Sequence, residues 1–215
     1  MGAAHTRRSL SRSKRLNMKK YLATICVGLP ALMLSAPTFA NEYNINVMVA
    51  ESRTYSNTAF WGFLNKEPAG LIVFDYADEG WPANVEVGFA NTNEKFWFTT
   101  TINGNLITAN GTFTVTELFG GVRKFWDMNG FRPSLGAGLT SVNFTGNETT
   151  NLGTAPTTNS SSLGFYVDGC VCGRIGEHFN IGLDWRMVSG TSINAWGASG
   201  DVDYTQYGIL LGYGW

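Results

Sequence analysis

After residue 40 the apolar residues of this chain tend to recur at every second position. At the C-terminus one face of the pattern is formed by Thr205, Tyr207, Ile209, Leu211, Tyr213 and Trp215. The other face carries mainly glycine and polar residues, and segments 163–175 and 179–189 alternate in the same way. Successive side chains of a strand point to opposite faces, so this period predicts β-strands with two unlike faces.

A soluble sandwich and a membrane barrel both give this alternation. In the sandwich the apolar face points into the core, whereas in the barrel it points outward into lipid and the polar face lines the interior. A barrel with its polar face outward would place Arg186 in lipid, at a cost of about 2–4 kcal/mol at the midplane. No segment after residue 40 holds the ~18 apolar residues of a membrane helix, and a closed barrel is the other way to cross. Aromatic residues stand at strand ends, where interfacial girdles belong: Trp126, Phe144, Phe179, Tyr204 and Trp215. We therefore predict an all-β fold, an eight-stranded antiparallel up-and-down transmembrane β-barrel.

The eight strands are expected at 43–51, 70–77, 83–95, 111–126, 132–144, 163–175, 179–189 and 203–215. Short turn-like connections at 78–82, 127–131 and 176–178 suit periplasmic turns. Longer connections at 52–69, 96–110, 145–162 and 190–202 alternate with them, as extracellular loops do. The segment 145–162 is rich in Thr, Asn, Ser and Gly and has little apolar content, so we expect it to be mobile.

The first forty residues have the composition of a targeting segment. Lys19 and Lys20 precede an apolar run, and the small residues Thr38 and Ala40 follow it. This arrangement predicts a secretory signal peptide over 18–40 that is cleaved before Asn41. Met18 heads the signal, so residues 1–17 form an N-terminal extension that need not be translated. The barrel then occupies 41–215.

The charge distribution excludes one large class of function. All 16 Asp and Glu residues follow residue 40, whereas seven of the 15 Lys and Arg residues precede it, which leaves eight bases against 16 acids. A net-acidic chain of this kind is not a basic nucleic-acid binder. Three Cys and two His residues form no spaced ligand cluster, so we predict no metal and no cofactor.

Cys170 and Cys172 are expected on one strand face. An ideal strand would separate their side chains by about 7 Å, which is too far for a disulfide. We therefore predict that both are small filling residues, with a redox-sensitive thiol pair as the alternative.

The final strand, from Tyr207 to Trp215, ends on an aromatic residue and has apolar residues at alternate positions before it. On this feature the chain resembles the small Gram-negative outer-membrane barrels, the class of the OmpA transmembrane domain and OmpX. A weaker similarity lies in Glu117–Arg123 followed by Arg132–Gly138, which resembles an "E…GxR…RPxxGAG" hairpin of uncharacterised members. The resemblance implies the cell outer membrane as location and a C-terminal assembly signal made of Tyr207, Ile209, Leu211, Tyr213 and Trp215.

Strand parity places charges of both signs on the inner face: Asp75, Glu86, Glu117, Arg123, Arg132, Asp168, Arg174, Asp184 and Arg186. An eight-stranded barrel has an interior just wide enough for side chains, and buried charges must pair. We predict that these residues form a salt-bridge network that fills the lumen. A gated, narrow ion path is the alternative.

An enzyme that modifies lipid is the third interpretation. A deacylase needs a His–Ser pair near the membrane, and His178, the one histidine after residue 40, has no serine at +2. We expect a non-enzymatic protein of envelope structure, or of surface recognition through its loops, with Trp61, Trp97 and Trp196 as exposed aromatic candidates. The expected partners are outer-membrane lipid and lipopolysaccharide, and, during biogenesis, periplasmic chaperones and the outer-membrane assembly machinery. No nucleic acid is expected.

Overall fold

The computed structural model describes residues 42–57, 67–102, 104–195 and 198–215. The predicted extension and signal segments, 1–17 and 18–40, lie outside these residues, as do Trp61 and Trp196. The strands are β1 (Glu42–Tyr55), β2 (Glu67–Ala77), β3 (Asn84–Ile102), β4 (Asn105–Phe125), β5 (Ser134–Thr150), β6 (Gly153–Thr154), β7 (Thr158–Ile175), β8 (Phe179–Ser189), β9 (Ser192–Ala195), β10 (Ala198–Asp201) and β11 (Tyr204–Gly214). The described residues include no helix of the length and hydrophobicity that crossing a membrane requires.

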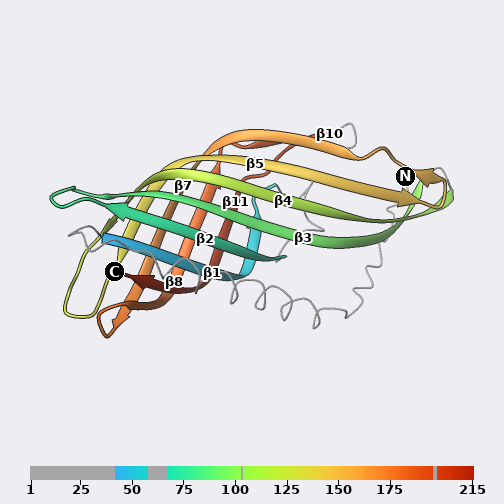
Figure 1. Ribbon diagram of the computed structural model, residues 1–215. Coiled ribbons are helices and arrows are strands. Elements are labelled where there is room, and N and C mark those ends of the chain that lie inside the picture. The colour runs from blue at the N-terminus through green and yellow to red at the C-terminus, as the bar shows by residue number, and fades with distance from the viewer. Residues whose placement is uncertain (1–41, 58–66, 103, 196–197) are drawn as a thin grey trace. The chain divides into compact units, whose positions relative to one another are not determined.

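Eight of these strands form a closed ring, which Figure 1 shows from the side. The hydrogen-bonded order is β4-β3-β2-β1-β11-β8-β7-β5, and β4 also pairs with β5. Every pairing in the ring is antiparallel, and apart from β1 and β11 the neighbours in the ring follow one another along the chain, with only the short β6, β9 and β10 between them. The seam between the first and last strands closes with two backbone hydrogen bonds of 3.0 Å between Tyr43 and Trp215. The predicted eight-stranded up-and-down topology is confirmed.

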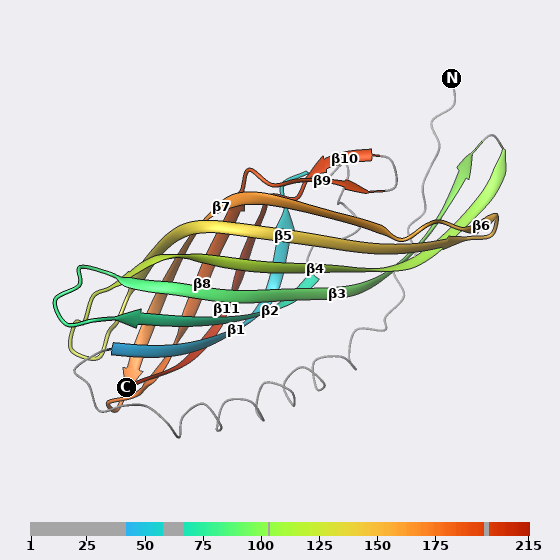
Figure 2. The ribbon, with the colours of Figure 1, turned by 45° about the horizontal axis from the view of Figure 1, so that its top comes forward.

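The two ends of the ring differ, and we name them by their connections. At the turn end, β2–β3, β4–β5 and β7–β8 are joined by short connections, and the C-terminus lies there too (Figure 1). Asn129 and Gly130 both have positive φ, 51° and 88°, as a two-residue type I′ turn requires. At the loop end, Figure 2 shows β3, β4, β5 and β7 running well beyond the other strands.

The longer connections were predicted as extracellular loops, and where the structure describes them much of their length is paired strand. Segment 96–110 is a hairpin in which β3 and β4 stay paired out to Ile102 and Asn105. Segment 145–162 contains the paired ends of β5 and β7, and 190–202 contains the β9–β10 hairpin (Figure 2). We call the part of β3, β4, β5 and β7 made by residues 91–116 and 143–161 the extended wall.

Side-chain hydrogen bonds support the pairing of strands in the Thr- and Asn-rich part of the barrel, and the mobility of segment 145–162 stays a prediction. On the outer face of the extended wall, Asn93 donates to Thr114 at 2.7 Å and Thr145 donates to Asn159 at 2.9 Å. Threonine is favoured in strands, and such cross-strand pairs stabilise a sheet without an apolar face. The expectation of mobility rested on apolar content alone and ignored this second source of strand stability.

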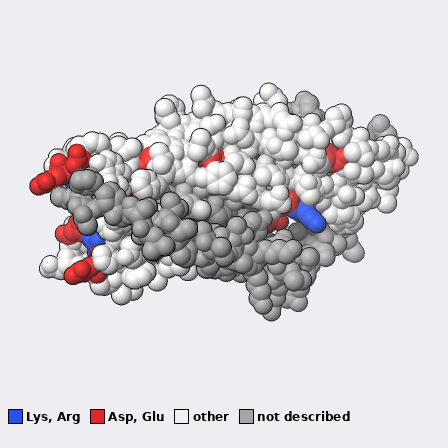
Figure 3. All heavy atoms as spheres, in the orientation of Figure 1, with Lys and Arg blue, Asp and Glu red and all other residues white. Residues whose placement is uncertain are grey.

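The outer surface of the ring is apolar and the inner surface is polar, as predicted from the alternation of side chains along each strand. The outward side chains include Phe89 of β3, Leu118 of β4 and Leu183 of β8, all exposed. Only a few charged atoms reach the face drawn in Figure 3 between the two ends. At the next outward position toward the loop end, the pair Phe89–Leu118 of β3 and β4 gives way to Asn91 and Thr116. An apolar band bordered in this way is the surface of a membrane barrel.

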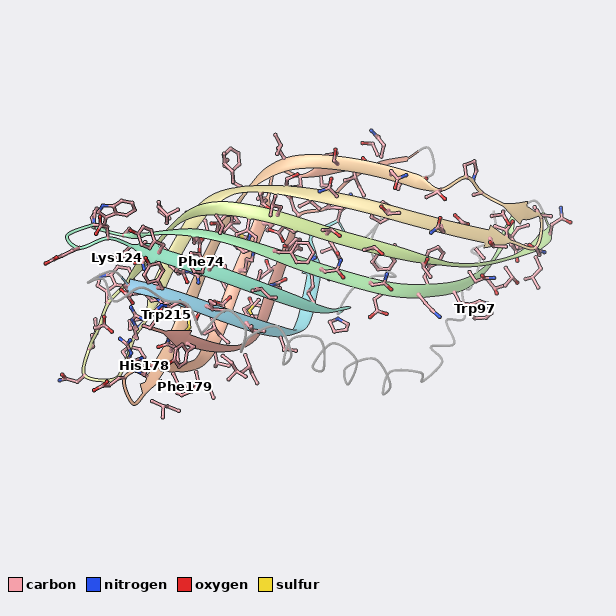
Figure 4. The ribbon with its side chains drawn as sticks, in the orientation of Figure 1. Phe74, Trp97, Lys124, His178, Phe179 and Trp215 are labelled. Atoms are coloured by element: carbon pink, nitrogen blue, oxygen red, sulfur yellow. A yellow bond between two sulfur atoms is a disulfide. The ribbon has the colours of Figure 1, made fainter. Side chains whose placement is uncertain are left out.

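Aromatic side chains form a girdle at the turn end. The rings of Tyr43 and Trp215 stack with centroids 5.7 Å apart, and Tyr213 contacts Phe179 at 5.1 Å. Figure 4 places Phe74, Phe179 and Trp215 together at this end. Two residues predicted for the girdle are elsewhere, since Phe144 and Tyr204 are each 1% exposed and point into the ring. Both stand at inward positions of their strands, so parity and not nearness to a strand end decides their place.

Candidate functional site

The centre of the lumen is organised around Arg123 of β4. Its guanidinium lies 2.9 Å from Glu86, 2.8 Å from Asp168 and 3.6 Å from Asp75. Each of these four side chains is at most 1% exposed. The acids come from three different strands, so a single guanidinium links β2, β3 and β7 across the interior. Charged groups removed from water in this way are tolerated because they are paired and hydrogen-bonded.

A second cationic centre lies nearer the loop end. Arg186 of β8 contacts Glu117 at 2.6 Å and Asp168 at 3.2 Å, so Asp168 joins the two centres. Its guanidinium lies 3.8 Å from the ring centroid of Phe119 and 3.9 Å from that of Tyr166. Aromatic faces attract a desolvated cation, so these two rings and two carboxylates hold Arg186 in one position.

The sequence analysis missed Arg53, which the structure adds to this centre. Arg53 is fully buried, lies 3.9 Å from Glu117 and donates to Gln206 at 2.9 Å. A register shift between Ala50 and Ser52 interrupts the pairing of β1 with β11. Before the shift the even-numbered Asn44 and Asn46 point inward, and after it the odd-numbered Arg53 and Tyr55 do. A bulge inserts one residue and reverses the parity, and nothing in the period-two pattern marks its position.

The structure separates three of the predicted network residues from this central group. Arg132, buried, contacts Glu42 and lies 3.1 Å from Asp127 at the turn end. Arg174 is 26% exposed and lies 3.9 Å from the same Asp127. Asp184 is buried in the lumen, yet neither carboxylate oxygen has a hydrogen-bond partner among the residues that the structure describes. We use "central network" for the residues that are joined: Arg53, Asp75, Glu86, Glu117, Arg123, Asp168 and Arg186.

Tyrosine hydroxyls complete the central network. Tyr166 donates to Glu86, and Tyr204 donates to Glu117, while Thr140 donates to Glu117 at 2.7 Å. Asn46 donates to Asp75 at 2.7 Å. Tyr166 bonds the Glu86 oxygen that Arg123 does not contact, and the other donors add hydrogen bonds to oxygens that also face an arginine. These bonds from neutral groups lower the cost of burying the acids.

Buried side chains also lie on the loop-end side and on the turn-end side of this network. Toward the loop end, an aromatic layer of Phe96, Phe113 and Phe144 is buried, and the rings of Phe113 and Phe144 stack at 6.3 Å. Toward the turn end, the space bordered by Arg123, Arg132 and their neighbours admits no water-sized sphere. Side chains therefore occupy the interior at each of these levels in the described part of the ring.

Cys170 and Cys172 correct a prediction, because the structure joins them in a disulfide. Their Cα atoms are 5.7 Å apart, shorter than the ideal spacing of two residues along a flat strand and inside the range that disulfides use. Strand rise shortens where a strand twists strongly, as in a small barrel. The idealised rise used in the sequence argument therefore gave too long a distance. Both cysteines are buried in the turn-end part of the lumen.

The predicted assembly-signal residues lie along the last strand as expected from parity. Tyr207, Ile209 and Leu211 are exposed on the apolar band, and Tyr213 and Trp215 belong to the girdle. His178 lies beside them at the turn end (Figure 4). Its Nδ1 is 2.8 Å from the Gly214 carbonyl oxygen, and its ring stacks on Tyr213. Among the described residues no group of three or more His, Cys, Asp or Glu is arranged to hold a metal ion.

The fold has counterparts among solved structures. It matches the Yersinia pestis attachment invasion locus protein Ail, solved in complex with the heparin analogue sucrose octasulfate, with a TM-score of 0.53 and 15% identity over 82% of this chain and 100% of Ail. It also matches a major outer membrane protein of Thermus thermophilus, with a TM-score of 0.51 and 11% identity over 82% of this chain and 100% of the other. At these identities the likeness is one of fold, and it confirms the predicted class of outer-membrane β-barrel. No protein-family model and no curated protein sequence matches the chain.

Proposed function

We propose that this barrel is a closed, non-conducting and non-enzymatic protein of the cell outer membrane, which presents its extended wall for recognition outside the cell. The observation that carries the first part is the filled lumen. Arg123 and Arg186 are held between carboxylates from several strands, and an aromatic layer covers them toward the loop end. An ion would have to displace paired guanidinium groups, which are costly to leave unpaired in a dry interior.

The position of His178 supports a non-enzymatic role. Its ring is stacked in the turn-end girdle and bonded to a backbone carbonyl, and Tyr213 covers one of its faces. A general base must be within hydrogen-bond reach of a nucleophile and of substrate. The contacts of this histidine with Tyr213 and Gly214 instead hold the turn against the last strand.

The extended wall supports recognition of an uncharged polar partner. Its sequence, residues 91–116 and 143–161, contains a single Lys or Arg, Lys95. Trp97, labelled in Figure 4, is 58% exposed on the outer face, and Asn110 is its partner on the neighbouring strand. The heparin analogue bound by Ail is a polyanion, and one lysine is a poor counterpart for such a ligand. Exposed tryptophan and neutral hydrogen-bonding groups suit a neutral carbohydrate better.

A planar-bilayer recording tests the closed lumen. The purified barrel should show no steady, large conductance, while a trimeric porin treated in parallel shows its usual steps. The heat-dependent shift in gel mobility verifies that the same preparation contains folded barrel. A recording without conductance then cannot be explained by missing protein. Steady openings on the nanosiemens scale would instead identify the alternative function, a narrow pore.

Shortening the extended wall tests the recognition part. Because Asn93 and Thr114 face each other, residues 94–113 can be replaced by Asn-Gly, which forms a two-residue hairpin turn. Cells with the shortened protein should assemble the barrel and bind less to a panel of neutral glycans than cells with the full chain. Equal binding by both would show that the wall does not carry recognition.

A further inference from the structure

A groove interrupts the lipid-facing surface across β7, β8 and β11. It has a volume of about 380 Å³, within the ~300–1,000 Å³ usual for ligand sites. We call it the acyl groove, and its outward residues form two rows: Gly169, Trp185 and Tyr207 in one row, and Val171, Leu183 and Ile209 in the next. Asp184 and Gly208, at lumen-facing positions between these rows, also border it. The pairing Ile175–Phe179–Tyr213 lies on its turn-end side and the pairing Phe165–Ser189 on its loop-end side, so it is at mid-depth in the apolar band.

Gly169 makes the groove, and the packing of the barrel does not require a glycine there. A Cβ added to Gly169 would come no nearer than 3.4 Å to another heavy atom, the carbonyl oxygen of Ser134. At the lumen-facing Gly138 and Gly182 the corresponding distances are 2.3 and 2.4 Å, so glycine is needed at those positions for close approach. The missing side chain at Gly169 leaves room beside Trp185, its partner across the strands.

The chemistry of the lining selects a hydrocarbon occupant. Val171, Leu183 and Ile209 are exposed apolar side chains continuous with the lipid-facing band. A water molecule needs two to four polar partners, and the outward side chains of the groove offer a phenol and an indole only. An empty groove would forfeit dispersion contacts along its walls, so an acyl chain of the surrounding bilayer is the natural filler.

Charge along these strands selects the kind of lipid. The only Lys or Arg residues between 153 and 215 are Arg174 and Arg186, and Arg186 is sealed in the lumen. The loop end of this wall instead carries Asp203, which bonds Ser189, and so disfavours the phosphates of a lipopolysaccharide. Arg174 lies on β7 at the turn end, but it is five residues from Gly169 and therefore on the inner face of the strand, where it pairs with Asp127. Neither cation thus lies on the face of the groove.

We infer that the acyl groove binds one chain of a phospholipid from the turn-end leaflet, away from the acidic Asp203 at the loop end. This site depends on the barrel lying in a membrane and not on whether its lumen conducts. The outward Gly120 of β4 offers a matched control position, because a Cβ there would have similar room, 3.5 Å to the Glu86 carbonyl oxygen, away from the groove.

The test compares the unchanged protein with Gly169→Leu and Gly120→Leu. Each is reconstituted in vesicles of phosphatidylethanolamine, phosphatidylglycerol and lipopolysaccharide, extracted in mild detergent and weighed by native mass spectrometry, and folding is verified by the gel-mobility shift. We expect the unchanged protein and Gly120→Leu to retain one phospholipid, and Gly169→Leu to retain about tenfold less. Equal retention by all three folded proteins would overturn the site. So would retention of lipopolysaccharide in place of phospholipid, or a dimer of the unchanged protein that Gly169→Leu abolishes.

Discussion

A Cβ atom on Gly121 would lie 2.5 Å from the hydroxyl oxygen of Tyr166. Gly121 and Gly138, on the neighbouring strands β4 and β5, face each other and leave a bare strip of backbone on the lumen wall. The ring of Tyr166 crosses this strip and reaches Glu86, its hydrogen-bond acceptor. The glycine-rich inner face therefore makes room for the large side chains of the central network in a narrow barrel.

Replacing Gly121 by alanine should lower the free energy of unfolding by about 1–3 kcal/mol, the usual cost of overpacking. The adjacent Gly120 faces lipid, where a Cβ would have no contact nearer than 3.5 Å. Gly120→Ala should be neutral or stabilise by up to ~1 kcal/mol, since alanine loses less conformational freedom in a strand. Denaturant unfolding of both variants in lipid vesicles measures the difference. Equal effects at the two positions would contradict the close approach of Tyr166.

Arg186→Met should destabilise the barrel by about 3–5 kcal/mol, because it leaves Glu117 buried with only the more distant Arg53 as cationic partner. The double variant Arg186→Met/Glu117→Gln removes both charges and should recover a large part of that loss. Lys124→Met, at an exposed position near the turn end (Figure 4), is the control and should change stability by at most ~0.5 kcal/mol.

The same unfolding measurements decide whether the charges are coupled. If the double variant is as unstable as Arg186→Met alone, the loss comes from the packing of the guanidinium between Phe119 and Tyr166, or from Arg53, which Glu117→Gln leaves buried without its carboxylate partner. A recovery in the double variant assigns the loss to the unpaired carboxylate.

Much of the barrel could be predicted because strand parity is a local property of the sequence. The inward positions of Glu117, Asp168 and Arg186 follow from period two, and the structure buries all three. Parity says nothing about depth along the barrel axis, so it could not show that Arg174 lies at the exposed turn end. It also fails beyond a bulge, which is why Arg53 was missed.

The disulfide and the extended wall were missed for a different reason. The distance between Cys170 and Cys172 depends on the local twist of the strand, and this twist is imposed by closing the ring and not by the residues at that point. Likewise Asn93 and Thr145 support strand extension only through partners that register brings opposite them. Strand length and the distance between the two cysteines both depend on pairing with distant segments. The alternation of residues along a single segment therefore does not contain them.

Thiol labelling checks the disulfide directly. After unfolding without reductant, the mature barrel should react with no maleimide at Cys170 or Cys172, because both sulfurs are bonded to each other. After treatment with dithiothreitol both should be labelled. Labelling of both cysteines before reduction would show that they are the free filling residues expected from an ideal strand.

The last prediction concerns Trp215, whose ring stacks on Tyr43 across the seam of the barrel. The backbone bonds between these two residues do not need the indole, so a refolded Trp215→Ala barrel should still close. The proposed assembly signal does need the terminal aromatic side chain. In cells, Trp215→Ala should therefore give several-fold less heat-modifiable protein in the outer-membrane fraction. Trp81→Ala is the control, because Trp81 is also a tryptophan at the turn end in contact with a tyrosine, Tyr76, but lies in a turn and not at the terminus. Equal losses for both variants would mean that the girdle merely stabilises the barrel, and that Trp215 has no separate part in assembly.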